Sequence, residues 1–151
     1  MKVLIQRVKK ASVTIDNEKI SAIGRGILIF LGIKTGDTEK DIEHLTEKII
    51  NLRIFPMNKG GGKFDKSLLD IGGEALIVSQ FTLYGDCSKG RRPSFTESAS
   101  PQEAEIMYNK FVQKFEKTGI KTQTGKFQAM MDISLVNDGP VTLMLATHSL
   151  I

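Results

Sequence analysis

Cysteine is almost absent from this sequence. Cys87 is the only one in 151 residues, which excludes an intrachain disulfide and a cysteine-based zinc site. Long apolar runs are absent too, since none approaches the ~20 residues of a membrane-spanning helix. The first apolar stretch begins at Val3 and already meets the charged Arg7, which is too short for a signal peptide. We therefore expect a soluble, cytoplasmic protein without a membrane partner.

Histidine is also scarce. His44 and His148 are the only two, and neither lies in a recognisable motif. The patterns H-E-x-x-H of zinc proteases and G-x-S-x-G of serine hydrolases do not occur. Both histidines are better interpreted as structural or solvated side chains, so we expect no metal and no other cofactor.

What is present fits one domain that covers residues 1–151. A composition of 40% hydrophobic and 25% charged residues excludes a disordered or collagen-like chain. The net charge of +4 permits a polyanionic partner without requiring one. The basic residues are spread along the chain, with local clusters only at residues 9–10 and 89–92, and a solvated surface explains these clusters equally well.

Apolar runs predict the strands. They cover residues 3–8, 12–15, 26–33, 74–83, 120–124, 130–136 and 141–147. The run at 26–33 is apolar throughout and bounded by glycines, which is typical of a strand buried on both faces. We expect plain loops at 58–63, where the spacing does not fit a phosphate-binding loop, and at 85–96. A turn at 137–140 should join the last two strands.

Two helices complete the prediction. The first should begin at Asp37 or Thr38 and bury one face, formed by Ile42, Leu45, Ile49 and Leu52. The second has Ser100 as N-cap, Pro101 in the first turn and Glu103 to complete a capping box. Its buried face consists of Ala104, Met107, Phe111 and Phe115, and it should end at Thr118 and Gly119. We expect an α/β fold: β-sheets packed face to face, barrel-like, with two helices covering one side, in three layers β/β/α.

Two short segments carry the chemistry. Residues 79–84 (Ser-Gln-Phe-Thr-Leu-Tyr) place hydroxyls and an amide at the end of an apolar run. A hydroxyl nucleophile such as Ser79 or Thr82 needs an adjacent base, and the sequence offers none. Thr82 is therefore either an ordinary strand threonine or part of an ester-hydrolysing site. In such a site backbone N–H groups would stabilise the oxyanion and the substrate would supply the activating group.

The second segment is residues 137–142 (Asn-Asp-Gly-Pro-Val-Thr). A trans bond between Gly139 and Pro140 is the default, and a turn alone explains the sequence. A cis bond would instead turn neighbouring carbonyls to the same side, where they could meet a ligand. The sequence leaves both possibilities open.

Because it contains both of these segments, the chain resembles the D-aminoacyl-tRNA deacylases, also called D-tyrosyl-tRNA deacylases. Residues 79–83 match the SQFTL motif of that family, and residues 137–142 match its NxGPVT motif. Further matches are residues 6–8, residues 90–95, and Phe127 with its neighbours Ala129 and Met131. One departure is Gln128, where the family usually has glycine. The resemblance extends over the whole chain, and the two main motifs together are highly specific.

The resemblance implies a chiral-proofreading hydrolase that releases D-amino acids from the 3′ end of tRNA. The implied enzyme is a homodimer with its active sites at the subunit interface. The turn of Gly139 and Pro140, in the cis form and held by Arg7, would enter the partner's site beside the catalytic residues Ser79, Gln80, Phe81 and Thr82. Val141, Thr142, Phe127, Ala129 and Met131 would complete the selective wall. If backbone atoms alone reject L-aminoacyl-tRNA, glycyl-tRNA would not be rejected, because glycine has no Cβ. Glycyl-tRNA would then be a second substrate.

The resemblance also suggests tRNA contacts, and other functions remain open. Lys89, Arg91 and Arg92 are candidate phosphate contacts, and Phe81 or Phe95 could stack on the terminal adenosine. A related deacylase that edits L-alanine lacks the Gly-Pro pair and has a different first motif. A non-catalytic RNA-end-binding module and a threonine-nucleophile esterase are the remaining alternatives.

Overall fold

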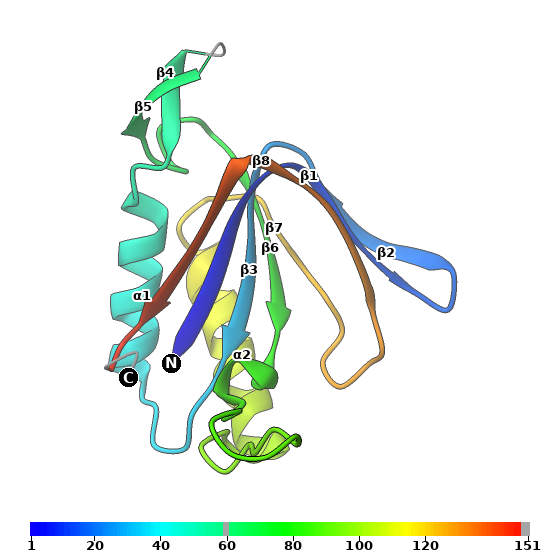
Figure 1. Cartoon of the computed structure of the whole chain (residues 1–151). Helices are drawn as coiled ribbons and strands as arrows, with labels where there is room; N and C mark the ends of the chain where they lie inside the picture. The colour runs from blue at the N-terminus through cyan, green and yellow to red at the C-terminus, as the bar shows by residue number, and fades with distance from the viewer. Residues whose placement is uncertain (59–60, 149–151) are drawn as a thin grey trace.

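The computed structural model describes residues 1–58 and 61–148. Its elements, in chain order, are β1 (Lys2–Ile15), β2 (Glu18–Ile23), β3 (Gly26–Gly32), α1 (Glu39–Asn51), β4 (Phe55–Asn58), β5 (Gly61–Lys66), β6 (Glu74–Ser79), the 3₁₀ helix η1 (Phe81–Tyr84), α2 (Pro101–Glu116), β7 (Thr122–Thr124) and β8 (Asp132–Ala146) (Figure 1).

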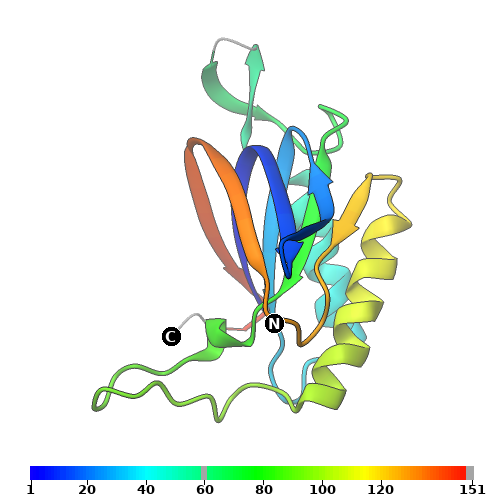
Figure 2. The same cartoon turned by 90° about the vertical axis from the view of Figure 1, so that its right-hand side faces the viewer.

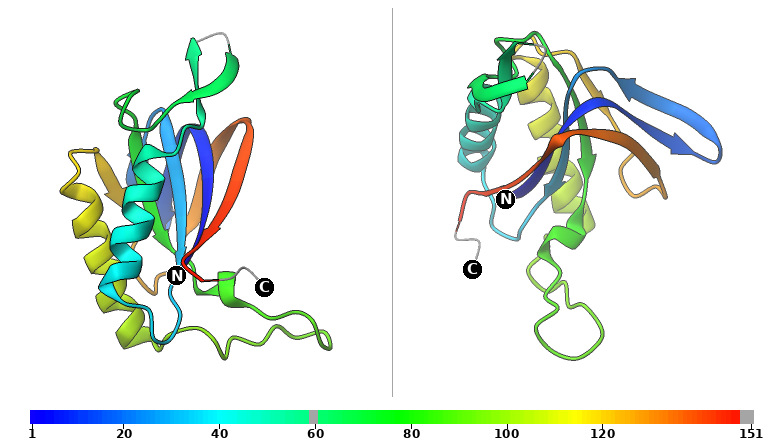
Figure 3. Two further views of the ribbon diagram at one scale, coloured as in Figure 1. Left: turned by 90° about the vertical axis from the view of Figure 1, so that its left-hand side faces the viewer. Right: turned by 45° about the horizontal axis from the view of Figure 1, so that its top comes forward.

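The long strand β1 organises the main sheet. Along one edge it pairs with β8 from Lys2 to Thr14, and along the other edge it pairs first with β3 and then with β2, always antiparallel. Beyond β3 the sheet continues with the parallel strands β6 and β7. Because β1, β2 and β8 bend together, the six strands form a nearly closed, barrel-like sheet (Figures 1 and 3).

Both helices cover the same side of this sheet (Figures 2 and 3). Their apolar faces and the facing side of β1, β3 and β6 form the larger core, which includes the fully buried Phe111 and Phe115. A second core lies on the opposite, concave side of the sheet, between residues such as Val13, Leu28 and Val78. The predicted barrel-like fold with two helices on one side is confirmed, and strand β3 is buried on both faces as expected.

The helix boundaries follow from their caps. Thr38 precedes α1, and its backbone N–H donates to the Asp41 carboxylate at 2.7 Å, which closes a capping box. Ser100 precedes α2 and accepts a hydrogen bond from the Glu103 backbone N–H at 3.3 Å. Helix α2 ends at Glu116, just before the predicted stop, and Gly119 follows in the left-handed region with φ +83°.

Several predicted element boundaries were wrong. The segments 3–8 and 12–15 are one continuous strand, because both halves pair with β8. Residues 130–147 do not form two strands joined by a turn: β8 runs through 137–140 without reversing, and those residues form a bulge. The expected strand 74–83 ends at Ser79. The supposed plain loop at 58–63 lies across the end of the hairpin β4–β5, with residues 59–60 outside the described residues.

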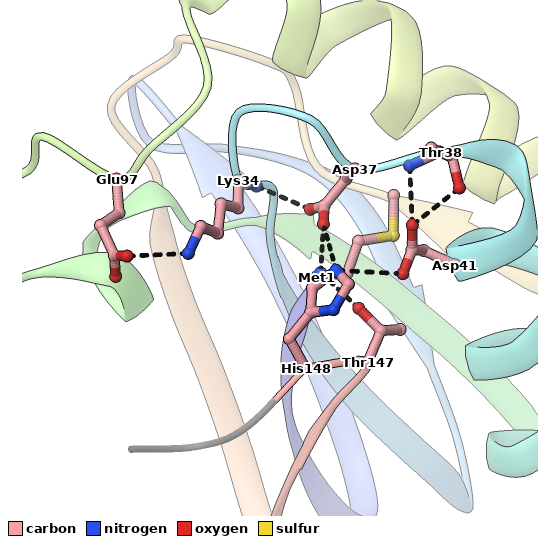
Figure 4. A network of polar contacts seen from close by, with 8 residues as sticks. All are labelled: Met1, Lys34, Asp37, Thr38, Asp41, Glu97, Thr147 and His148. Carbon is pink, nitrogen blue, oxygen red and sulfur yellow. Dashed lines mark hydrogen bonds and ion pairs between the residues drawn. The ribbon is translucent and has the colours of Figure 1, made fainter.

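The start of β1 is held by a buried charge (Figure 4). The Met1 amino group donates to Asp37 at 2.6 Å and to the Thr147 hydroxyl at 2.8 Å. The Asp37 side chain is only 1% exposed, and its second oxygen accepts the Lys34 backbone N–H at 2.7 Å. Asp37, Asp41 and His148 are close enough to share a cation, but the ammonium group already supplies the positive charge at Asp37.

We predict that Asp37→Asn lowers the free energy of unfolding by about 3 kcal/mol, because it leaves a buried ammonium without its counter-charge. Urea denaturation at neutral pH measures this. The control is Glu97→Gln, which removes the exposed ion pair of Glu97 with Lys34 (2.8 Å) and should cost less than about 1 kcal/mol. Equal effects of the two variants would show that burial does not strengthen the Met1–Asp37 pair.

Candidate functional site

The first motif lies where β6 leaves the sheet. The Gln80 backbone N–H still donates to the Leu31 carbonyl at 2.8 Å, and the chain then turns into η1. Phe81 and Thr82 begin this helix and are both exposed. Their backbone N–H groups make no backbone hydrogen bond to another described residue, as expected for the first turn of a helix. The end of a buried strand thus presents two N–H donors and a hydroxyl to the surface.

The surroundings of Thr82 do not activate its hydroxyl. The Gln80 side-chain amide donates a hydrogen bond to the Thr82 oxygen, whereas a nucleophilic hydroxyl needs an acceptor for its proton. The nearest phenol along the chain, Tyr84, is buried. That burial, followed by the charges of Asp37, Glu97 and Asp41, raises the Tyr84 pKa, so the phenol stays neutral.

A pocket of about 680 Å³ opens beside this strand end. It is lined by Val78, Ser79, Gln80, Phe81, Ala99, Pro101, Ala104, Phe127, Gln128, Ala129, Met130, Met131 and Ile133. None of these side chains is ionisable. The structure therefore brings Ser79, Gln80 and Phe81 together with the predicted wall residues Phe127, Ala129 and Met131, in an environment without a side-chain acid or base.

The wall opposite η1 is a tight turn. The Ala129 backbone N–H donates to the Lys126 carbonyl at 3.2 Å, and Gln128 has φ +61°. This left-handed conformation favours glycine at the third position of such a turn, which explains why glycine is common there in the family that the chain resembles. Gly125 approaches Met131 so closely that an added Cβ would lie 2.7 Å from the Met131 sulfur. The turn and Met131 therefore pack as one unit.

The second motif forms an exposed bulge in the middle of β8. Gln6 of β1 pairs with Thr142, but Val8 already pairs with Asn137, so the residues between them protrude from the ladder. The Asn137 side chain closes the bulge by accepting the Val141 backbone N–H at 3.1 Å and donating to the Thr142 hydroxyl at 2.9 Å. The bond between Gly139 and Pro140 is cis, and Gly139 has φ +128°. Both residues are exposed, whereas Val141 is buried.

Arg7 of β1 contacts this bulge with its side chain. Its side chain is 9% exposed, and Nε lies 3.1 Å from the Asp138 carbonyl oxygen and 3.3 Å from the Asp138 carboxylate. At its other end Nη1 donates to the Ile54 carbonyl at 2.6 Å, and the guanidinium lies over the Phe64 ring, 5.7 Å from its centre. Within one chain, Arg7 therefore connects the bulge to Ile54 and to the Phe64 ring.

Sequence reasoning missed Ile54 and Phe64, because it predicted no strand on either side of the loop 58–63. The hairpin β4–β5 projects from the sheet (Figures 1 and 2). Phe64 of β5 and Ile54, the residue just before β4, both contact Arg7. A possible signal was Phe64 itself, an aromatic residue just after a run of glycines.

The two motifs do not meet within one chain. Ser79 pairs with Leu31, which pairs with Val3 of β1, whereas the bulge lies opposite Arg7. Four residues along a strand correspond to about 13 Å, and three strand spacings from β6 to β8 add about 14 Å across the sheet. Figures 1 and 2 show η1 and the middle of β8 at opposite ends of the sheet.

The predicted nucleic-acid contacts lie on the long segment between η1 and α2, which extends away from the sheet (Figure 2). Lys89, Arg91 and Arg92 are all exposed there. Phe95 packs edge-on against Phe81, with ring centres 5.0 Å apart. This contact connects the basic segment directly to the pocket wall.

Comparison with known proteins shows the family of this chain. A protein-family model described as D-Tyr-tRNA(Tyr) deacylase matches residues 4–146. A protein of Geotalea uraniireducens named D-aminoacyl-tRNA deacylase is 56% identical over 147 residues, covering 97% of this chain and 94% of the relative. One of Desulfatibacillum aliphaticivorans with the same name is 53% identical over 145 residues, covering 96% and 98%.

Two solved structures have the same fold. The c-Myc DNA Unwinding Element Binding Protein has a TM-score of 0.91 and 44% identity, covering 99% of this chain and 100% of the other. A probable eukaryotic D-amino acid tRNA deacylase has a TM-score of 0.82 over 95% of this chain and 97% of the other. Its identity of 17% shows the fold alone. Within residues 1–58 and 61–148, no helix has the length and apolar character to span a bilayer.

We predict that Arg7→Ala lowers the free energy of unfolding by about 3 kcal/mol, since it leaves the Ile54 carbonyl and the Asp138 carboxylate without their donor. Arg25→Ala is the matched control. Arg25 also lies 5.7 Å from the centre of a phenylalanine ring, that of Phe55, but it is exposed and should cost less than about 1 kcal/mol. Urea denaturation compares the two, and similar losses would mean that Arg7 contributes only its contact with the ring.

Proposed function

Because this chain belongs to the D-Tyr-tRNA(Tyr) deacylase family and is a D-aminoacyl-tRNA deacylase, we propose that its pocket beside Ser79 holds the aminoacylated 3′ end of tRNA. The observation that carries this proposal is the pocket itself. It is an apolar cavity without ionisable side chains, lined by Phe81 but not by Thr82, and the backbone N–H groups of Phe81 and Thr82 make no backbone hydrogen bond to another described residue. Such a site suits hydrolysis of an ester, in which charge develops on the carbonyl oxygen.

The site is completed by a second copy of the chain. In this proposal the bulge with Gly139 and Pro140 enters the partner's pocket, so that the enzyme is a homodimer with its active sites at the interface. Two features support this. The bulge is exposed but firmly held by Arg7, and it lies at the opposite end of the sheet from the pocket of its own chain. An exposed segment that is held in this way could enter the pocket of another copy of the chain.

Chiral selection then rests on backbone atoms. Carbonyl groups of Gly139 and Pro140 would leave no room for the Cβ of an L-amino acid, whereas the side chain of a D-amino acid points outward. Steric exclusion of the wrong substrate does not depend on the nature of the side chain. Glycine has no Cβ, so glycyl-tRNA should be a second substrate.

The 2′-hydroxyl of the terminal adenosine would activate the attacking water. The Gln80 amide donates a hydrogen bond to the Thr82 hydroxyl oxygen, and no ionisable side chain lines the pocket. The 2′-hydroxyl of the substrate is therefore the group best placed to activate the attacking water. Phe81 and Thr82 would contribute their backbone N–H groups to the oxyanion, and the Thr82 hydroxyl would serve to orient Gln80.

The basic segment would bind the tRNA backbone. Lys89, Arg91 and Arg92 are exposed, and phosphate contacts of this kind make binding depend strongly on salt. Phe95 lies against Phe81 at the pocket wall, where an aromatic ring can stack on an unpaired base. An enzyme acting on tRNA in this way is expected in the cytoplasm.

The proposal is tested with matched D-tyrosyl-tRNA and L-tyrosyl-tRNA. Purified protein should hydrolyse the D-ester rapidly and leave the L-ester at its spontaneous rate. Loss of both esters would show that the Gly139–Pro140 bulge is not the chiral filter and would favour a general esterase. Binding of tRNA without hydrolysis of either ester would favour a binding module.

Removing the Thr82 hydroxyl should have a limited effect. We predict that Thr82→Ala keeps kcat within about tenfold of the unmodified enzyme, because the lost hydrogen bond only orients Gln80. A D-tyrosyl-tRNA with a 2′-deoxy terminal adenosine should react at least about 10²-fold more slowly, as expected when a proton-transfer group is removed.

Single-turnover rates distinguish the two effects, with Thr82→Ser as the control that keeps the hydroxyl. If Thr82→Ala abolished turnover while the 2′-deoxy substrate still reacted, Thr82 would be the nucleophile and substrate assistance would be wrong.

A further inference from the structure

Gln128 adopts a backbone conformation that its residue type disfavours. Among the described residues, Asp16, Asn17 and Gln128 are the only non-glycine residues with positive φ. Asp16 and Asn17 form the tight connection between β1 and β2, where Asp and Asn tolerate this conformation. Gln has no such tendency, and residues held in sparsely populated regions gather at functional sites.

Gln128 is an exposed residue at the pocket wall. Of the residues that line it, only Ser79, Gln80 and Gln128 have polar side chains. The Gln80 amide already donates to Thr82, whereas the Gln128 amide makes no hydrogen bond to another described side chain or backbone group. Gln128 therefore offers the pocket an uncommitted donor and acceptor side by side.

The rest of the pocket suits a flat aromatic ligand. Phe81 and Phe127 contribute aromatic rings, and Met131 contributes a polarisable thioether; both kinds of side chain pack well against rings. No charged side chain lines the walls, which disfavours a phosphate group inside. The volume of about 680 Å³ is within the range for small-molecule sites, roughly 300–1,000 Å³.

We infer that Gln128 is a specificity-determining residue that hydrogen-bonds the adenine base of the tRNA terminus. This inference rests on the proposed function. The Gln128 Nε2 group would donate to a ring nitrogen, and its Oε1 would accept from the exocyclic amino group, which is the pairing that glutamine makes with adenine. The amide at this position would thus recognise the base by hydrogen bonds, whereas the rest of the pocket distinguishes ligands only by their shape.

The experiment uses D-tyrosyl-tRNA ending either in adenosine or in purine riboside, which lacks only the 6-amino group. Loss of one hydrogen bond should lower kcat/KM of the unmodified enzyme by about tenfold. Gln128→Met keeps the length and the left-handed backbone but has no amide. It should be about tenfold weaker on adenosine-ended substrate and should lose nothing further when the amino group is removed.

A second variant separates recognition from stability. Gln128→Gly should raise the melting temperature, because glycine accepts the left-handed conformation, and should still lose about tenfold in kcat/KM. The inference is overturned if the unmodified enzyme is indifferent to the 6-amino group, or if Gln128→Met discriminates between the two substrates as strongly as the unmodified enzyme.

Binding of uncharged tRNA with either terminal nucleoside provides a readout that does not depend on hydrolysis. The unmodified protein should bind the adenosine-ended form more tightly, and Gln128→Met should bind both forms equally. Absence of D-tyrosyl-tRNA hydrolysis would refute the proposed function, whereas equal binding of both termini by the unmodified protein would refute the role of Gln128 alone.

Discussion

The antiparallel pairing of β1 with β8 is the interaction on which the rest of the structure depends. It joins the two ends of the chain, and it runs along the whole of β1 with one large irregularity between Gln6 and Val8. At that point the ladder cannot accommodate the extra residues of β8, so they protrude. Arg7 fills the space beneath them, and its hydrogen bonds to Asp138 and Ile54 join the bulge to the neighbouring hairpin.

This arrangement places the bulge far from the pocket of the same chain. The pocket lies at the end of β6, where the turn at Gln128 packs beside Met131. Strands β1 and β3 separate the bulge in β8 from the pocket at the end of β6, and both faces of this sheet carry a hydrophobic core. In our proposal, a second copy of the chain brings its bulge to each pocket.

The pocket also limits the chemistry. It has amides and aromatic rings but no ionisable side chain, and catalysis as we propose it relies on electrostatic stabilisation and on groups of the substrate. A site of this kind discriminates by shape and by hydrogen bonding to exposed edges. Gln128 and the Gly139–Pro140 bulge would discriminate at the two ends of the same substrate.

Local patterns in the sequence were sufficient for much of the fold. The cap residues Thr38 and Ser100 and the apolar face of each helix predicted α1 and α2, because capping and periodicity act over a few residues. The continuous apolar run that became β3 was also recognisable. The predictions failed where a distant segment decides the outcome. Residues 137–140 have the composition of a turn. Because the residues before and after them both pair with β1, strand β8 nevertheless continues in the same direction.

The sequence by itself determined the helices, the buried strands, the family and the two motifs, because each depends on residue types at short spacing. Only the tertiary structure decided that these motifs lie at opposite ends of one sheet, that the hairpin β4–β5 brings Ile54 and Phe64 to Arg7, and that Gln128 lines the pocket. These facts depend on strand register and on contacts between segments far apart in the chain, and no local pattern encodes such contacts.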